Sequence, residues 1–341
     1  MKYLNYFIFL LTIIILSSGA SLAGPKKIVY SSGNSNNGLM QIFLMDDDGS
    51  NKQQITNLDV NCYAPKFSPD GQSVVFYTDE EKVYYIPDIY AEKIAEPKYI
   101  FPGTTPSFAP SGDYIIFNAE LDGPLSIYAI APDDYEPEMI SPGSYANQQV
   151  FSRDANYLVF STFYEGSKCI FIIDLNDTTE NALMKVSINT DSNLEPDISS
   201  NGDMVVYASF NSNLKGTICL FQNGKEKMLT KGVSWNHPVF SPNDSKIACI
   251  KIPDEESTIL VVMDIDGSNK KELNIKDKNV GTFQWIDSEN IIFDAENGTE
   301  SNIGVVNITT GKVIILAEKG INIQPDMQKD YSELEDVLPD Q

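Results

Sequence analysis

A single histidine, His237, is the only side chain in the chain that could serve as the base of a Ser-His-Asp triad. It stands directly before Pro238 in a motif that recurs along the chain, and no Gly-x-Ser-x-Gly nucleophile elbow is present. One histidine also excludes a multi-histidine metal centre. We therefore expect His237 to be structural, and the sequence names no catalytic, cofactor-binding or metal-binding residue.

Carboxylates are the other chemically active groups, with 48 aspartates and glutamates. A pair of carboxylates that cleaves a glycosidic bond remains an alternative, but no spacing between these residues indicates which two would form it. Asp154, Asp197 and Asp203 recur with the repeat described below, which predicts that they cap turns.

Two segments resemble calcium loops, Asp46–Asn51 and Asp264–Asn269. An EF-hand needs glycine at position six and glutamate at position twelve. In both segments glycine is fourth, and the twelfth residues are Asn57 and Ile275. We predict hairpin turns and no cofactor, with calcium as the less favoured alternative.

The four cysteines, Cys62, Cys169, Cys219 and Cys249, show neither a dense disulfide framework nor the Cys-x-x-Cys pairs of a zinc site. Three of them stand inside apolar runs such as Cys169-Ile-Phe-Ile-Ile. This pattern predicts small buried side chains in preference to a disulfide bridge.

The formal net charge of -24 disfavours nucleic acids and anionic lipid as partners and favours basic or neutral ones.

The N-terminus has the pattern of a signal peptide. Lys2 precedes an apolar run from Leu4 to Leu16, and small residues at Ser21 and Ala23 predict cleavage after Ala23. The run is shorter than the roughly 20 residues that span a bilayer, so an uncleaved anchor is the less favoured alternative. We expect residues 1–23 to be removed, and a periplasmic or secreted protein without membrane insertion after cleavage.

A repeat runs through the rest of the chain. Pro-x-Phe-Ser-Pro-Asp-Gly, clearest at residues 65–71, is followed by a β-branched and aromatic run such as Val74-Val75-Phe76. Proline, aspartate and glycine suit a tight turn, and the apolar run suits a buried strand. The anchor residues of the copies, 41 to 47 residues apart, are Phe67, Phe108, Phe151, Ile198, Phe240 and Trp285.

Each copy predicts four antiparallel strands, which is one blade of a β-propeller. Lys27–Ser31 matches the second strand of a copy, and Asn322–Met327 matches a first strand with no second strand after it. These half-units predict a seventh blade shared by both chain ends. The expected fold is all-β and seven-bladed, with six or eight blades as alternatives, over residues 24–329, followed by an acidic tail at 330–341.

These motifs, with Leu194-Glu195-Pro196-Asp197 and Asn236-His237-Pro238, resemble the WD40-like Pro-Asp repeats of the TolB-like propeller family. The resemblance covers about residues 27–329. The resemblance to TolB itself would imply a small α/β domain joined to a six-bladed propeller. We expect that α/β domain to be missing before Ile28.

The resemblance implies the fold and not the function. Because no catalytic motif is present, we expect a non-catalytic, exported interaction or envelope-scaffold module, a monomer that binds a protein or an envelope polymer. The alternatives are a polysaccharide lyase or hydrolase with a carboxylate or tyrosine site, and a sugar- or small-ligand-binding propeller.

Overall fold

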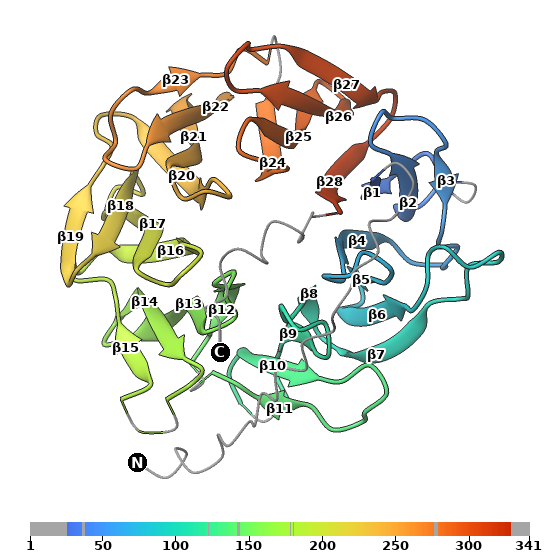
Figure 1. The fold of residues 1–341 in the computed structure, drawn as a ribbon, viewed down its shortest axis with the longest axis horizontal. Helices are drawn as coiled ribbons and strands as arrows, with labels where there is room; N and C mark the ends of the chain where they lie inside the picture. Colours follow the sequence, from blue (N-terminus) through green and yellow to red (C-terminus); the bar gives the residue numbers. More distant parts are fainter. Residues whose placement is uncertain are drawn as a thin grey trace, which may run out of the picture. The chain divides into compact units, whose positions relative to one another are not determined.

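The computed structural model describes residues 26–328, apart from 36–37, 122, 142–143, 178, 180 and 276–278. The described residues form seven antiparallel sheets of four strands each, a seven-bladed β-propeller (Figure 1). This confirms the predicted fold class, and the blade number is seven rather than six or eight. Within these residues no helix is long and apolar enough to cross a membrane. The predicted signal peptide and acidic tail lie outside the described residues.

Six blades are each built from four consecutive strands. The first three are β4 (Cys62–Phe67), β5 (Val74–Thr78), β6 (Lys82–Ile86) and β7 (Lys98–Pro102); β8 (Thr104–Phe108), β9 (Ile115–Ala119), β10 (Ser126–Ile130) and β11 (Glu138–Met139); and β12 (Asn147–Phe151), β13 (Tyr157–Tyr164), β14 (Ser167–Asp174) and β15 (Leu183–Lys185). The next three are β16 (Ser192–Ile198), β17 (Met204–Phe210), β18 (Gly216–Gln222) and β19 (Lys225–Met228); β20 (Ser234–Phe240), β21 (Lys246–Asp254), β22 (Ser257–Asp264) and β23 (Lys271–Glu272); and β24 (Asn279–Trp285), β25 (Asn290–Asn297), β26 (Glu300–Asn307) and β27 (Val313–Ala317).

The seventh blade unites the two ends of the chain, as the half-units predict. Its strands are, in spatial order, β28 (Asn322–Met327), β1 (Lys27–Ser32), β2 (Gln41–Asp46) and β3 (Gln53–Gln54). β28 pairs antiparallel with β1, with Ile28 opposite Met327 and Ser32 opposite Asn322 (Figure 1). Each terminal strand thus covers an edge that the other would leave unpaired.

The described residues fall into two compact units. One contains the blades β12–β15, β16–β19 and β20–β23, and the other contains β24–β27, the blade with both chain ends, β4–β7, and the strands β8 and β9. The residues of β10 and β11 are divided between the two units. In each unit apolar side chains fill the space between neighbouring blades. Ile218, Trp235 and Val261 pack together in the first unit, and Ile42 and Phe76 in the second. The β-branched and aromatic runs therefore form the buried faces, as their composition predicts.

Six of the seven first strands share a bulge at which one residue has a positive φ. The register shifts at this point, and in five of the six strands the next residue is proline. A bulge leaves its residue outside the ladder and redirects the side chain. The bulge residues are Ala64 (φ 47°), Thr105 (47°), Gln148 (58°), Glu195 (55°), His237 (49°) and Gln324 (55°).

Candidate functional site

The most distinctive polar group of the first unit is a row of three bulge residues, Gln148, Glu195 and His237. They belong to β12, β16 and β20, which contact one another in sequence order. The first strands of these three neighbouring blades therefore lie side by side within one unit. We call these three residues the bulge row.

Hydrogen bonds connect the members of the bulge row from one blade to the next. The backbone N–H of Glu195 donates to Oε1 of Gln148 at 2.9 Å, and that of His237 donates to Oε2 of Glu195 at 2.8 Å. A bulge takes its N–H out of the sheet ladder, and such a group needs another acceptor. The side chain of the preceding blade provides that acceptor, so the row ties neighbouring first strands together.

Glu195 and His237 also contact each other through their side chains. Nδ1 of His237 lies 3.3 Å from Oε1 of Glu195, and the side chains are 52% and 17% exposed, respectively. Among the described residues no lysine or arginine forms an ion pair with Glu195. The row therefore presents hydrogen-bond acceptors and a carboxylate whose only charged partner would be a protonated histidine.

The pairing of His237 with a carboxylate is the geometry that orients a general base in a catalytic triad. In the part of the chain that the structure describes, however, no serine, threonine or cysteine side chain is hydrogen-bonded to His237. The histidine occupies the repeated first-strand position that its motif predicts. What sequence reasoning missed is its contact with Glu195, although both residues stand directly before the proline of the repeat.

In the second unit the equivalent region is built around a buried carboxylate, Asp294 of β25, which is 3% exposed. It accepts hydrogen bonds from the backbone N–H of Thr282 at 3.2 Å, from the Thr282 hydroxyl, and from the N–H of Gln324 at 2.9 Å. Gln324 in turn accepts from the N–H of Ala64 at 2.8 Å. Burial raises the pKa of the Asp294 carboxyl above its usual range.

A shifted pKa at a buried acid can mark a functional site. The partners of Asp294, however, are groups of neighbouring strands in its own unit, which indicates a structural tie. A Cβ on Gly281 would lie 2.3 Å from Oδ1 of Asp294, so the backbone approaches the carboxylate as closely as only glycine allows. Sequence reasoning did not single out Asp294.

The turn-capping prediction holds for Asp154. Its Oδ1 accepts from the backbone N–H of Asn156 at 3.1 Å and from the Ser152 hydroxyl at 2.6 Å. In the next blade the cap is Asn201, whose Oδ1 accepts from the N–H of Asp203 at 3.2 Å. Asp203 therefore lies in the turn without capping it.

The same prediction is wrong for Asp197. This residue lies in β16, after the bulge, and its Oδ2 accepts from the N–H of Phe240 in the next first strand at 2.7 Å. Asp326 of β28 accepts from the N–H of Phe67 in the same way at 2.9 Å. The bulge directs the aspartate of Pro-Asp toward the next blade, where it satisfies a backbone donor.

The two calcium-like segments are the predicted hairpin turns, between β2 and β3 and between β22 and β23. Asp46 bonds to Lys27 and Asn51, and Asp264 bonds to Lys246 and Asn269. The hydrogen bond from the lysine is the largest cause that lowers the pKa of each aspartate. Among the described residues no group of three or more histidine, cysteine, aspartate or glutamate side chains is placed to hold a metal ion.

All four cysteines are free and buried, and for Cys169, Cys219 and Cys249 the apolar runs predict this burial. Burial raises the pKa of the Cys62, Cys219 and Cys249 thiols to about 12. Since the thiolate is the reactive form, these three side chains are inert packing groups.

Seven four-stranded blades, six of which have a bulged first strand, define a β-propeller. The chain belongs to the TolB β-propeller domain family, whose model matches residues 25–288. The Tol-Pal system protein TolB of Francisella tularensis subsp. mediasiatica is 25% identical over 249 residues, covering 70% of this chain and 57% of that protein. The chain therefore spans a little over half the length of the curated relatives it matches.

Solved structures show the same fold. TolB from Acinetobacter baumannii aligns with a TM-score of 0.54 at 15% identity, covering 89% of this chain and 67% of that chain. A puromycin-hydrolyzing peptidase from Mycobacterium tuberculosis aligns with a TM-score of 0.68 at 14% identity, covering 87% of this chain and 52% of that chain. An oligogalacturonate lyase from Vibrio parahaemolyticus aligns with a TM-score of 0.53 at 13% identity, covering 77% and 73% of the respective chains. At these identities the likeness concerns the fold alone.

Proposed function

We propose that this protein is an exported, non-catalytic propeller that binds a protein partner through the bulge row. The observation that carries the proposal is the row itself: a repeated backbone feature presents a partly exposed carboxylate and an exposed imidazole side by side. The curated relatives, named Tol-Pal system protein TolB, support a role in a protein assembly.

The chemistry of the row favours a partner that supplies hydrogen-bond donors. Glu195 is largely shielded from water, and a cationic group that reaches it experiences a stronger attraction than at an open surface. The net charge of -24 would accelerate the approach of a basic segment and repel an acidic one. A lysine, an arginine or an amino terminus of the partner fits these requirements.

A pull-down tests the proposal. Tagged protein that starts at residue 24 is incubated with an envelope extract, alongside the variants Glu195→Ala and Glu318→Ala. Glu318 is an exposed carboxylate of the other unit, so its variant controls for the loss of one negative charge. We expect the parent and Glu318→Ala to retain the same protein, and Glu195→Ala to retain at least about tenfold less, as for a desolvated charge pair.

Two outcomes would overturn the proposal. One is equal retention by all three proteins. The other is no retained protein together with turnover of a glycan, which would support the polysaccharide-enzyme alternative. Amino-terminal sequencing of the exported chain tests the export itself, because cleavage after Ala23 makes Gly24 the first residue.

A further inference from the structure

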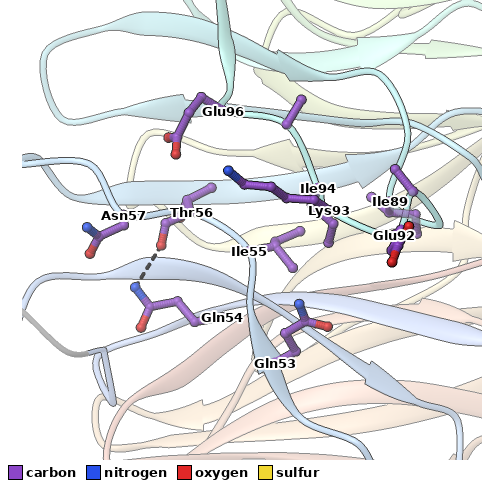
Figure 2. A pocket seen from close by; sticks show the side chains of 12 residues that line it. Gln53, Gln54, Ile55, Thr56, Asn57, Ile89, Glu92, Lys93, Ile94 and Glu96 are labelled. Carbon is purple, nitrogen blue, oxygen red and sulfur yellow. Dashed lines mark hydrogen bonds between the residues drawn. The ribbon is translucent and has the colours of Figure 1, made fainter.

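A groove of about 580 Å³ lies in the second unit (Figure 2). One wall is the segment 53–57, which contains β3, and the other is segment 89–96 of the connection between β6 and β7. The volume is within the range of sites that bind small ligands and short peptides. The first wall includes the short outer strand of the shared blade, and the second is a connection outside the repeat motif.

Isoleucines supply the apolar part of the groove. Ile55 and Ile89 are 8% and 4% exposed and belong to the core between β2 and β5, and Ile94 packs against the same core. Because these side chains are anchored in the core, the groove has a fixed apolar floor. A small aliphatic side chain of a ligand would lose water against it.

Four side chains of the groove, Gln53, Glu92, Lys93 and Glu96, form no hydrogen bond or ion pair among the described residues. Figure 2 shows Lys93 extending between the two walls, with Glu96 and Thr56 on either side. Polar groups that converge without bonding one another are available to a ligand. Two carboxylates against one ammonium give the groove an excess of negative charge.

The lining distinguishes between ligand classes. No aromatic residue lines the groove, so it offers no ring on which a sugar could stack. The amides of Gln53 and Asn57 provide both a donor and an acceptor, which match the N–H and C=O groups of a peptide. An extended peptide fits this combination of side-chain amides, an apolar floor and negative charge better than a saccharide does.

We propose that this groove binds an extended, basic segment of a protein partner. An aliphatic side chain of the segment rests on Ile55 and Ile94, and flanking lysine or arginine side chains pair with Glu92 and Glu96. This inference rests on the proposed function, since it gives the partner a second contact outside the bulge row.

The three isoleucines provide the measurement. Full-length mature protein labelled at its isoleucine δ1 methyl groups is titrated with the blocked tripeptides acetyl-Lys-Val-Lys-amide and acetyl-Glu-Val-Glu-amide. We expect the methyl resonances of Ile55, Ile89 and Ile94 to shift, and Ile250, in the other unit, to remain unchanged. The basic tripeptide should bind about fivefold more tightly, as expected for two partly exposed ion pairs.

The double variant Glu92→Lys/Glu96→Lys should reverse the order of the two tripeptides without changing the Ile250 resonance. The proposal is overturned if neither tripeptide shifts the three methyl groups, or if charge reversal has no effect. It is equally overturned if chitotriose shifts them and both tripeptides do not.

The outcomes for the two proposals are separable. Loss of pull-down in Glu195→Ala with intact tripeptide binding supports the bulge row and leaves the groove independent of it. A parent protein that retains no partner but still binds the basic tripeptide contradicts the proposed function alone.

Discussion

The same backbone bulge has different roles in the two units. In the first unit the bulge residues Glu195 and His237 carry side chains that reach water. In the second unit Gln324 bonds to a buried carboxylate, Asp294, and the series ends at Ala64, whose methyl group can accept nothing further. One repeated backbone conformation thus supports an accessible polar row in one unit and a closed structural tie in the other.

The bulge is a backbone feature that both units share. The side chain at the bulge determines whether the residue is part of an internal tie or reaches water. Both units need an acceptor for the bulge N–H, and both have one. Only in the first unit does the acceptor also expose a charge. The following substitutions test this distinction, from the largest expected effect to the smallest.

Gly281→Ala should destabilise the protein most, by about 2–3 kcal/mol, because its Cβ overlaps a buried carboxylate that three donors hold in place. Urea unfolding measures the loss. Gly33→Ala is the matched control: its Cβ would meet nothing closer than the Met40 sulfur at 3.4 Å, and we expect a change under about 0.5 kcal/mol. Equal losses in both variants would refute the close approach at Asp294.

Asp326→Ala should cost about 2 kcal/mol, because it leaves the buried N–H of Phe67 without its acceptor. Asp197→Ala removes the equivalent bond to Phe240 at a less buried position in the first unit, and we expect about half that loss. The same unfolding measurement compares them. A larger loss of unfolding free energy for Asp197→Ala than for Asp326→Ala would contradict this ranking of the two hydrogen bonds.

Asp294 should make stability depend on pH. Since burial raises its folded pKa above the unfolded value of about 3.9, the native state binds more protons between these two values, and stability falls as pH rises through that window. The difference in unfolding free energy between the parent and Asp294→Asn isolates this group. We expect the parent to lose stability relative to the variant from pH 4 to pH 7, and a constant or opposite trend contradicts the raised pKa.

Glu195→Gln should have the smallest effect on stability, under about 0.5 kcal/mol, because glutamine can still accept the N–H of His237. The same variant should abolish most partner retention if the row binds through its charge. Thermal unfolding and the pull-down are measured on one preparation. A stability loss near that of Asp326→Ala would make Glu195 a structural tie like Asp294.

Most of the fold could be predicted from the sequence, because the same pattern of strand and turn residues recurs in each copy of the repeat. The segment Lys27–Ser31 was expected to be a second strand and Asn322–Met327 a first strand, and they pair as β1 (Lys27–Ser32) and β28. The buried cysteines and the two aspartate turns were also predictable, since each depends on residues nearby in the chain.

The candidate site could not be predicted to the same degree. Asp197 was expected to cap a turn because residues of its kind recur with the repeat, whereas its carboxylate accepts from the N–H of Phe240, 43 residues away. Glu195 and His237 are separated by a whole blade in the sequence and meet only when β16 and β20 lie side by side. The groove likewise joins β3 to a connection of another blade.

The sequence by itself determined what is local and repeated: the strands, the turns, the number of blades, and the blade shared by the two ends. The hydrophobic pattern and the turn residues carry this information within each copy. Only the tertiary structure decided which side chains became accessible, because a one-residue bulge rotates every side chain near it and the neighbouring blade then supplies the partner. Asp294 and Glu195 are both carboxylates in first- or second-strand segments, yet packing buried one and left the other within reach of a ligand.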